Sequence, residues 1–159
     1  MPESWASRFD RWRLNWFPAY RATGARITYI ADDWLEVRVR LSLTWHTRNY
    51  VGTIFGGSLY GAVDPIYMVM LIRALGPEFV VWDQAATIRF LRPGRSTLHA
   101  TFRLGPEQVA TIAADARAEG RVTREFQVEL VDGEGQPCFA CTKTIYIRDK
   151  SATGQSRPA

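Results

Sequence analysis

The most constraining feature of this chain is one long apolar stretch that contains a single carboxylate. Residues 57–75 carry only two charged side chains, Asp64 in the middle and Arg73 near the end. The stretch predicts a helix that ends at Gly76-Pro77. Because this helix is apolar on all sides, the rest of the fold must cover most of it. An acid in such surroundings must be paired, protonated or used in chemistry.

Strand patterns surround this helix on both sides of the sequence. The segment Leu35–Leu43 alternates apolar with charged or polar residues, which is typical of an antiparallel strand with one face in solvent. Pro106 and Gly120 flank an alanine-rich surface helix over 106–119. The six predicted strands cover 25–31, 35–43, 79–91, 96–104, 122–132 and 137–148. Because strands and helices do not alternate regularly, we predict an α+β fold, an antiparallel sheet of about six strands wrapped around the central helix.

The sequence also predicts how the chain is divided. We expect an N-terminal aromatic helix over 1–20, a main domain over 21–148 with a helical insertion at 106–119, and a disordered tail over 149–159. In the N-terminal helix, aromatic residues recur at helical spacing: Trp5, Phe9, Trp12 and Trp16. We expect this aromatic face to pack on the body of the protein. The alternative is an interfacial helix that touches lipid or lines an acyl pocket.

Composition narrows the possible partners. The 159 residues, 47% of them hydrophobic, suffice for one domain with its own core. The net charge of +4 favours an anionic ligand such as a coenzyme A ester, whereas the scattered basic residues argue against nucleic acid.

Asp64, Pro65 and several glycines argue against a membrane span over 51–75. Cys138 and Cys141 are expected to be small buried residues, and two cysteines without an apolar leader favour the cytoplasm.

Asp64 is the first candidate for chemistry. A carboxylate without a partner in an apolar cleft has a raised pKa, which makes it a better base near neutral pH. Gly56 and Gly57 lie upstream, where backbone N–H groups at a helix start could hydrogen-bond a developing oxyanion. Two interpretations of Asp64 remain open: it could merely cap a helix that starts at Pro65, or it could lie in one helix kinked at that proline.

The spacing of these residues resembles that of a known family. Hotdog-fold thioesterases of the phenylacetyl-CoA thioesterase type carry a motif of Asn, five residues, His-Gly-Gly, six residues and Asp. This chain resembles that motif, with Asn49, Phe55-Gly56-Gly57 and Asp64 at the same spacings. Residues 88–93, Ile-Arg-Phe-Leu-Arg-Pro, resemble the end of a strand in that family. The resemblance covers about residues 25–148 and implies the hotdog fold. Phe55 in place of His is a departure, and the chain is similar here to a less characterised bacterial branch.

The resemblance implies an acyl-CoA thioesterase that needs no cofactor and no metal. Asp64 would be the general base or nucleophile, the Gly57 N–H would stabilise the oxyanion, and Asn49 would orient the water or the carbonyl. The implied substrate-binding residues are Phe55, Gly56, Tyr60, Arg92 and Arg95, the two arginines for the coenzyme A phosphates. A homo-oligomer, dimer or tetramer, is implied, with Asp64 and the segment 49–57 contributed by different subunits.

The sequence leaves two other functions open. Because Phe55 cannot donate a hydrogen bond, a non-catalytic acyl-CoA or lipid-binding hotdog protein is the alternative. A hotdog hydratase comes third, since that class pairs its acid with a His. Ser58 lacks the context of a serine hydrolase.

Overall fold

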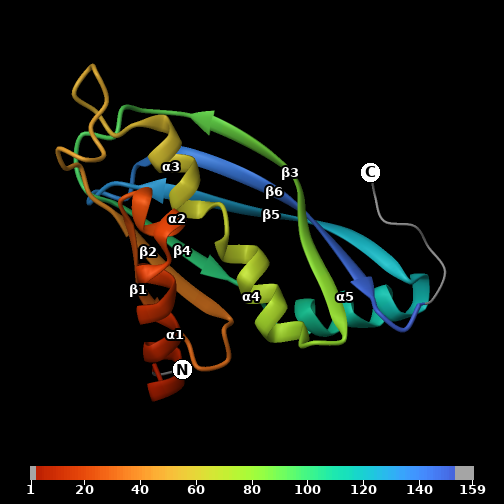
Figure 1. Ribbon diagram of the computed structural model, residues 1–159. Helices are drawn as coiled ribbons and strands as arrows, with labels where there is room; N and C mark the ends of the chain where they lie inside the picture. Colours follow the sequence, from red (N-terminus) through yellow and green to blue (C-terminus); the bar gives the residue numbers. More distant parts are fainter. Residues whose placement is uncertain (1–2, 153–159) are drawn as a thin grey trace.

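The structure, a computed structural model, describes residues 3–152 and consists of one curved sheet with helices on its concave face (Figure 1). The strands are β1 (Ala25–Ile30), β2 (Glu36–Leu41), β3 (Phe79–Phe90), β4 (Leu98–Arg103), β5 (Arg121–Val131) and β6 (Pro137–Asp149). They form a six-stranded sheet in the order β1-β2-β4-β5-β6-β3, and all pairs are antiparallel. The predicted α+β class is therefore confirmed, and each strand lies within two residues of its predicted bounds.

The central helix consists of α3 (Gly56–Val63) and α4 (Ile66–Leu75), and the sheet curls around it (Figure 1). Apolar and charged residues alternate along β2. Val37, Val39 and Leu41 are therefore buried on the side of the central helix, while the arginines between them are exposed. By length and composition Gly56–Leu75 could cross a membrane, but half of its apolar window is buried inside the protein. The buried core helix of a soluble protein can have the same length and apolar composition as a membrane span.

The remaining helices lie at the margins of the sheet. The N-terminal helices α1 (Trp5–Trp16) and α2 (Pro18–Ala22) pack against β1, and α5 (Pro106–Glu119) packs on β5 and β6. The expectation that the aromatic face of α1 packs on the body is wrong, because all four of its aromatic side chains are exposed. Most of the predicted tail, residues 153–159, lies outside the described residues. Cys138 and Cys141 are buried free thiols, as expected.

Candidate active site at the central helix

Pro65 kinks the central helix and sets the position of Asp64. Asp64 and Pro65 both keep helical dihedral angles, φ −50° and ψ −56° for Asp64 and φ −83° and ψ −10° for Pro65. Proline has no N–H, so the carbonyl of Gly61 loses its helical partner and the helix bends there. The Asp64 side chain makes no capping hydrogen bond to α4. Of the two interpretations of Asp64, the structure therefore supports the kinked helix rather than the cap.

The partner of Asp64 is a buried lysine on the sheet. Lys143 of β6 donates to Asp64 Oδ1 at 2.7 Å, and its Nζ lies 3.2 Å from Asp83 Oδ2 on the neighbouring strand β3. The Lys143 side chain is only 1% exposed, whereas that of Asp64 is 42% exposed. Its Nζ also lies 5.5 Å from the centre of the Tyr60 ring. We call Asp64, Asp83, Lys143 and Tyr60 the acid–lysine cluster.

Charges within this cluster shift the pKa values of its members. Burial by itself lowers the pKa of Lys143, but the carboxylates of Asp64 and Asp83 outweigh burial, and the net shift is upward. Burial raises the pKa of Asp83, and Lys143 opposes that shift. Burial and then the nearby Asp64 carboxylate raise the pKa of Tyr60. Lys143 is therefore a permanent cation at neutral pH, which holds Asp64 in one orientation.

The expectation of an Asp64 without a partner is wrong, because Lys143 pairs with it from β6. A pattern in β6 could have revealed it. Along 139–147 every second residue points inward, and four of these five are apolar or cysteine: Phe139, Cys141, Ile145 and Ile147. Lys143 occupies the fifth inward position, where a charge is retained only if it is paired.

The other half of the predicted site lies at the opposite end of α3. Phe55 is the N-cap of this helix, so the N–H groups of its first turn, including that of Gly57, have no partner four residues earlier. A Cβ on Gly57 would lie 2.4 Å from a Phe55 ring carbon, and a Cβ on Gly56 would lie 3.1 Å from the Phe90 ring. A Cβ at either position would therefore require one of these two exposed rings to move.

Asn49 and Arg92 meet this helix end in one shallow hollow. The hollow has a volume of about 360 Å³ and is lined by Asn49, Gly56, Phe90 and Arg92, among others. The Asn49 side chain is used within its own loop: it accepts from the N–H groups of Val51 and Thr53 and donates to the Thr53 hydroxyl. Arg92 and Arg95 are both exposed. The hollow thus brings together Asn49, Gly56 and Arg92. The other predicted site residues Asp64 and Tyr60 belong to the acid–lysine cluster.

One chain cannot bring both halves to the same carbonyl group. Gly57 and Asp64 are seven residues apart on one helix, which corresponds to about 10 Å along its axis. An oxyanion donor and a base must each lie about 3 Å from the reacting atoms. In one chain these two groups therefore belong to separate sites.

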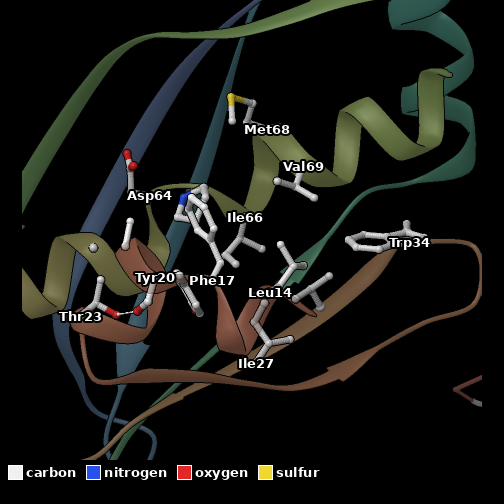
Figure 2. A pocket seen from close by; sticks show the side chains of 14 residues that line it. Leu14, Phe17, Tyr20, Thr23, Ile27, Trp34, Asp64, Ile66, Met68 and Val69 are labelled. Atoms are coloured by element: carbon white, nitrogen blue, oxygen red, sulfur yellow. Dashed lines mark hydrogen bonds between the residues drawn. The ribbon is translucent and has the colours of Figure 1, made fainter. Parts of the chain in front are cut away.

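An apolar cavity lies beside the kink. It measures about 310 Å³ and is bounded by α1, α2, β1, β2 and the kinked helix, with Leu14, Tyr20, Ile27, Met68 and Val69 among its lining residues. Asp64 and Pro65 border it, but Figure 2 shows the Asp64 carboxylate turned away from the apolar side chains of Ile27, Ile66 and Val69. The carboxylate instead faces the sheet, where it binds Lys143.

Comparison with known proteins agrees with the predicted fold. The family model described as "Domain of unknown function (DUF4442)" matches residues 6–147. A Pseudomonas aeruginosa protein described as a probable thioesterase of unknown function is 19% identical, with a TM-score of 0.80 over 94% of this chain and 98% of that one. No curated protein matches the sequence.

Two further solved structures carry more definite descriptions. A Haemophilus influenzae thioesterase is 16% identical, with a TM-score of 0.64 over 90% of this chain and 91% of that one. The PaaI protein from the phenylacetic acid degradation operon of Escherichia coli is 18% identical, with a TM-score of 0.61 over 89% of this chain and 91% of that one. These structures are thioesterase-like hotdog proteins, so the predicted hotdog fold is confirmed.

Proposed function

Since the chain belongs to the DUF4442 family and has the hotdog fold of thioesterase-like proteins, we propose that it hydrolyses acyl-CoA thioesters at Asp64. The observation that carries this proposal is the Asp64 carboxylate, which a buried lysine holds in place at a kink of the central helix. The carboxylate is fixed yet remains partly open to water, so a water molecule and a thioester can both reach it.

The proposed reaction uses Asp64 as a general base. Asp64 accepts a proton from water while the water oxygen attacks the thioester carbonyl carbon, and the carbonyl oxygen becomes an oxyanion. The N–H of Gly57 at a helix start stabilises that oxyanion. When the C–S bond breaks, the coenzyme A sulfur leaves with the electron pair and takes up the proton that Asp64 accepted from water. This step restores the Asp64 carboxylate and yields a carboxylic acid and a free thiol.

Two copies of the chain would complete this site. Strand β3 is an edge of the sheet, and its exposed residues include Trp82, Ile88 and Phe90. An exposed apolar edge strand favours pairing with another strand. If two β3 edges pair antiparallel about Ala86 and Thr87, Asp83 of one chain lies opposite Phe90 of the other. Lys143 links Asp83 to Asp64, and Phe90 lines the same hollow as Gly56, so the two half-sites would meet across the interface.

The expected assembly is therefore a dimer or a tetramer. Light scattering on the purified protein should give a mass at least twice the 18.1 kDa of one chain. The physical reason is the exposed β3 edge, which a monomer leaves open to solvent. A monomer at assay concentration would contradict the composite site.

A second candidate function is acyl-CoA or lipid binding without turnover. The Phe55 ring against Gly57 favours it, because a ring there supplies no hydrogen bond to a carbonyl oxygen. The apolar cavity also favours it, because the Asp64 carboxylate points away from the apolar side chains that line it.

A panel of acyl-CoA esters with detection of the released thiol separates the two functions. The panel should include aromatic, short, medium and long acyl groups, each also measured for binding by calorimetry. We expect thiol release from at least one class of ester. Tight binding of an ester with no release above the uncatalysed rate would favour the binding protein and contradict the hydrolase.

A further inference from the structure

An aromatic surface on the N-terminal helices remains unexplained by thioester hydrolysis. One face of α1 carries a row of four aromatic residues: Trp5, Phe9, Trp12 and Trp16. Phe17 continues this row at the junction with α2. We call these five residues the aromatic stripe. Each is more than half exposed, from 54% for Trp16 to 84% for Trp5. So much exposed aromatic surface in one row is typical of a docking surface.

The opposite face of α1 fixes the stripe in its outward orientation. Asn15 makes two hydrogen bonds to the backbone of Ile27 in β1, at 2.8 and 2.9 Å. Ser7 is buried and donates to the carbonyl of Ala31 at 3.4 Å. Leu14 packs against the core. Since these contacts hold the polar and aliphatic face inward, the aromatic side chains point to solvent.

Arginines lie directly on the rings of the stripe. The Arg8 guanidinium lies 5.0 Å from the Trp5 ring centre, and that of Arg21 lies 4.5 Å from the Trp16 ring centre. Within the described part of the chain, neither arginine forms an ion pair. The stripe thus combines large apolar rings with cations that no carboxylate of residues 3–152 neutralises. This combination fits a surface that is apolar inside and anionic at its boundary.

The place of the stripe in the fold argues against a second copy of the chain as its occupant. Helix α1 packs on β1, and β1 and β3 are the two opposite edges of the sheet. Pairing through β3 would leave the stripe uncovered. Phe17 also lines the apolar cavity, as does Leu14 behind the stripe. Figure 2 shows both side chains at that cavity, so the stripe adjoins an apolar space inside the protein.

We propose that the aromatic stripe docks the protein on the surface of an anionic lipid bilayer. The rings of Trp5, Phe9 and Trp12 enter the interface between headgroups and acyl chains, where Trp and Phe side chains are favourable. Arg8 and Arg21 contact the anionic headgroups. The docked helix lies in the plane of the membrane and does not cross it. This inference does not depend on the hydrolysis of thioesters.

Vesicle sedimentation tests the proposal. The full chain is mixed with vesicles of phosphatidylcholine alone or of phosphatidylcholine with phosphatidylglycerol. We expect binding to the anionic vesicles, weaker binding to the neutral ones, and loss of the difference at high salt. The Trp5→Ser, Trp12→Ser variant should lose about tenfold or more in partition. The Arg8→Gln, Arg21→Gln variant should keep weak binding but lose the preference for the anionic lipid.

A matched control uses two exposed aromatic residues outside the stripe, Trp45 and Tyr50. The Trp45→Ser, Tyr50→Ser variant should bind vesicles as the unchanged protein does. Circular dichroism and light scattering on every variant check the fold and the assembly. The proposal is overturned if the unchanged protein binds neither vesicle, or if the control variant loses as much binding as the stripe variant. A smaller assembly in the stripe variant would also overturn it, because the stripe would then be an interface between copies.

Discussion

Replacing Asp64 with Asn is expected to lower kcat/KM for acyl-CoA hydrolysis by roughly two to four orders of magnitude. Asparagine has nearly the same shape and can still accept a hydrogen bond from Lys143, so the helix kink and the fold should persist. It cannot take a proton from water at neutral pH, so the proposed base is lost. The measurement is steady-state hydrolysis of the best ester from the panel, with circular dichroism to check folding.

Asp83→Asn is the matched control for this variant. It removes the other carboxylate that contacts Lys143 and leaves the contact between Lys143 and Asp64 in place. We expect activity close to that of the unchanged protein. If Asp64→Asn kept its activity, or if both variants lost activity equally, Asp64 would not be the base.

The second large effect concerns stability. Lys143→Met should lower the free energy of unfolding by about 2 kcal/mol, because it leaves the partly buried Asp83 carboxylate without its cation. Most of the cost falls on Asp83, since its side chain is only 23% exposed and Lys143 is its sole ion-pair partner among the described residues. Asp64 contributes less, because water reaches its side chain. Urea unfolding at one fixed protein concentration measures the change.

The same measurement on a double variant separates charge from packing. Lys143→Met combined with Asp83→Asn removes both the cation and the partly buried anion, so part of the lost stability should return. A loss in Lys143→Met that the double variant does not reduce would point to packing instead. A single variant as stable as the unchanged protein would show that the acid–lysine cluster contributes nothing to the fold.

Local patterns in the sequence were enough to predict most of the architecture. The alternation of apolar and charged residues predicted β2. Pro106 and Gly120 predicted where α5 begins and ends, and the structure confirms both ends. Pro65 and Gly61 were enough to suggest a kinked helix. These predictions succeeded because each depends on residues that are neighbours along the chain.

Two predictions were wrong, the Asp64 without a partner and the inward aromatic face of α1, because both depend on contacts between distant residues. Lys143 and Asp64 are 79 residues apart, and only the packing of β6 beneath the helix brings them together. Helical spacing indicated that Trp5 and Trp12 share a face of α1, but not which face turns inward. Hydrogen bonds between the side chains of Asn15 and Ser7 and the main chain around β1 decide that orientation.

The most direct test of the composite site mixes two inactive variants. Asp64→Asn lacks the base, and Gly57→Pro lacks the N–H that would hold the oxyanion. Proline is tolerated in the first turn of a helix, so α3 should still form. Gly57→Ala is the control, because it adds a Cβ against Phe55 but keeps the N–H, and we expect it to remain active.

The two variants, with different tags, are refolded together so that mixed dimers form. In a mixed dimer, one of the two sites combines an intact Asp64 with an intact Gly57 from the other chain. Random pairing should therefore restore about a quarter of the activity of the unchanged protein. If mixed dimers form and the mixture stays as inactive as its two parents, the site does not combine Asp64 of one chain with Gly57 of another, and the account is contradicted.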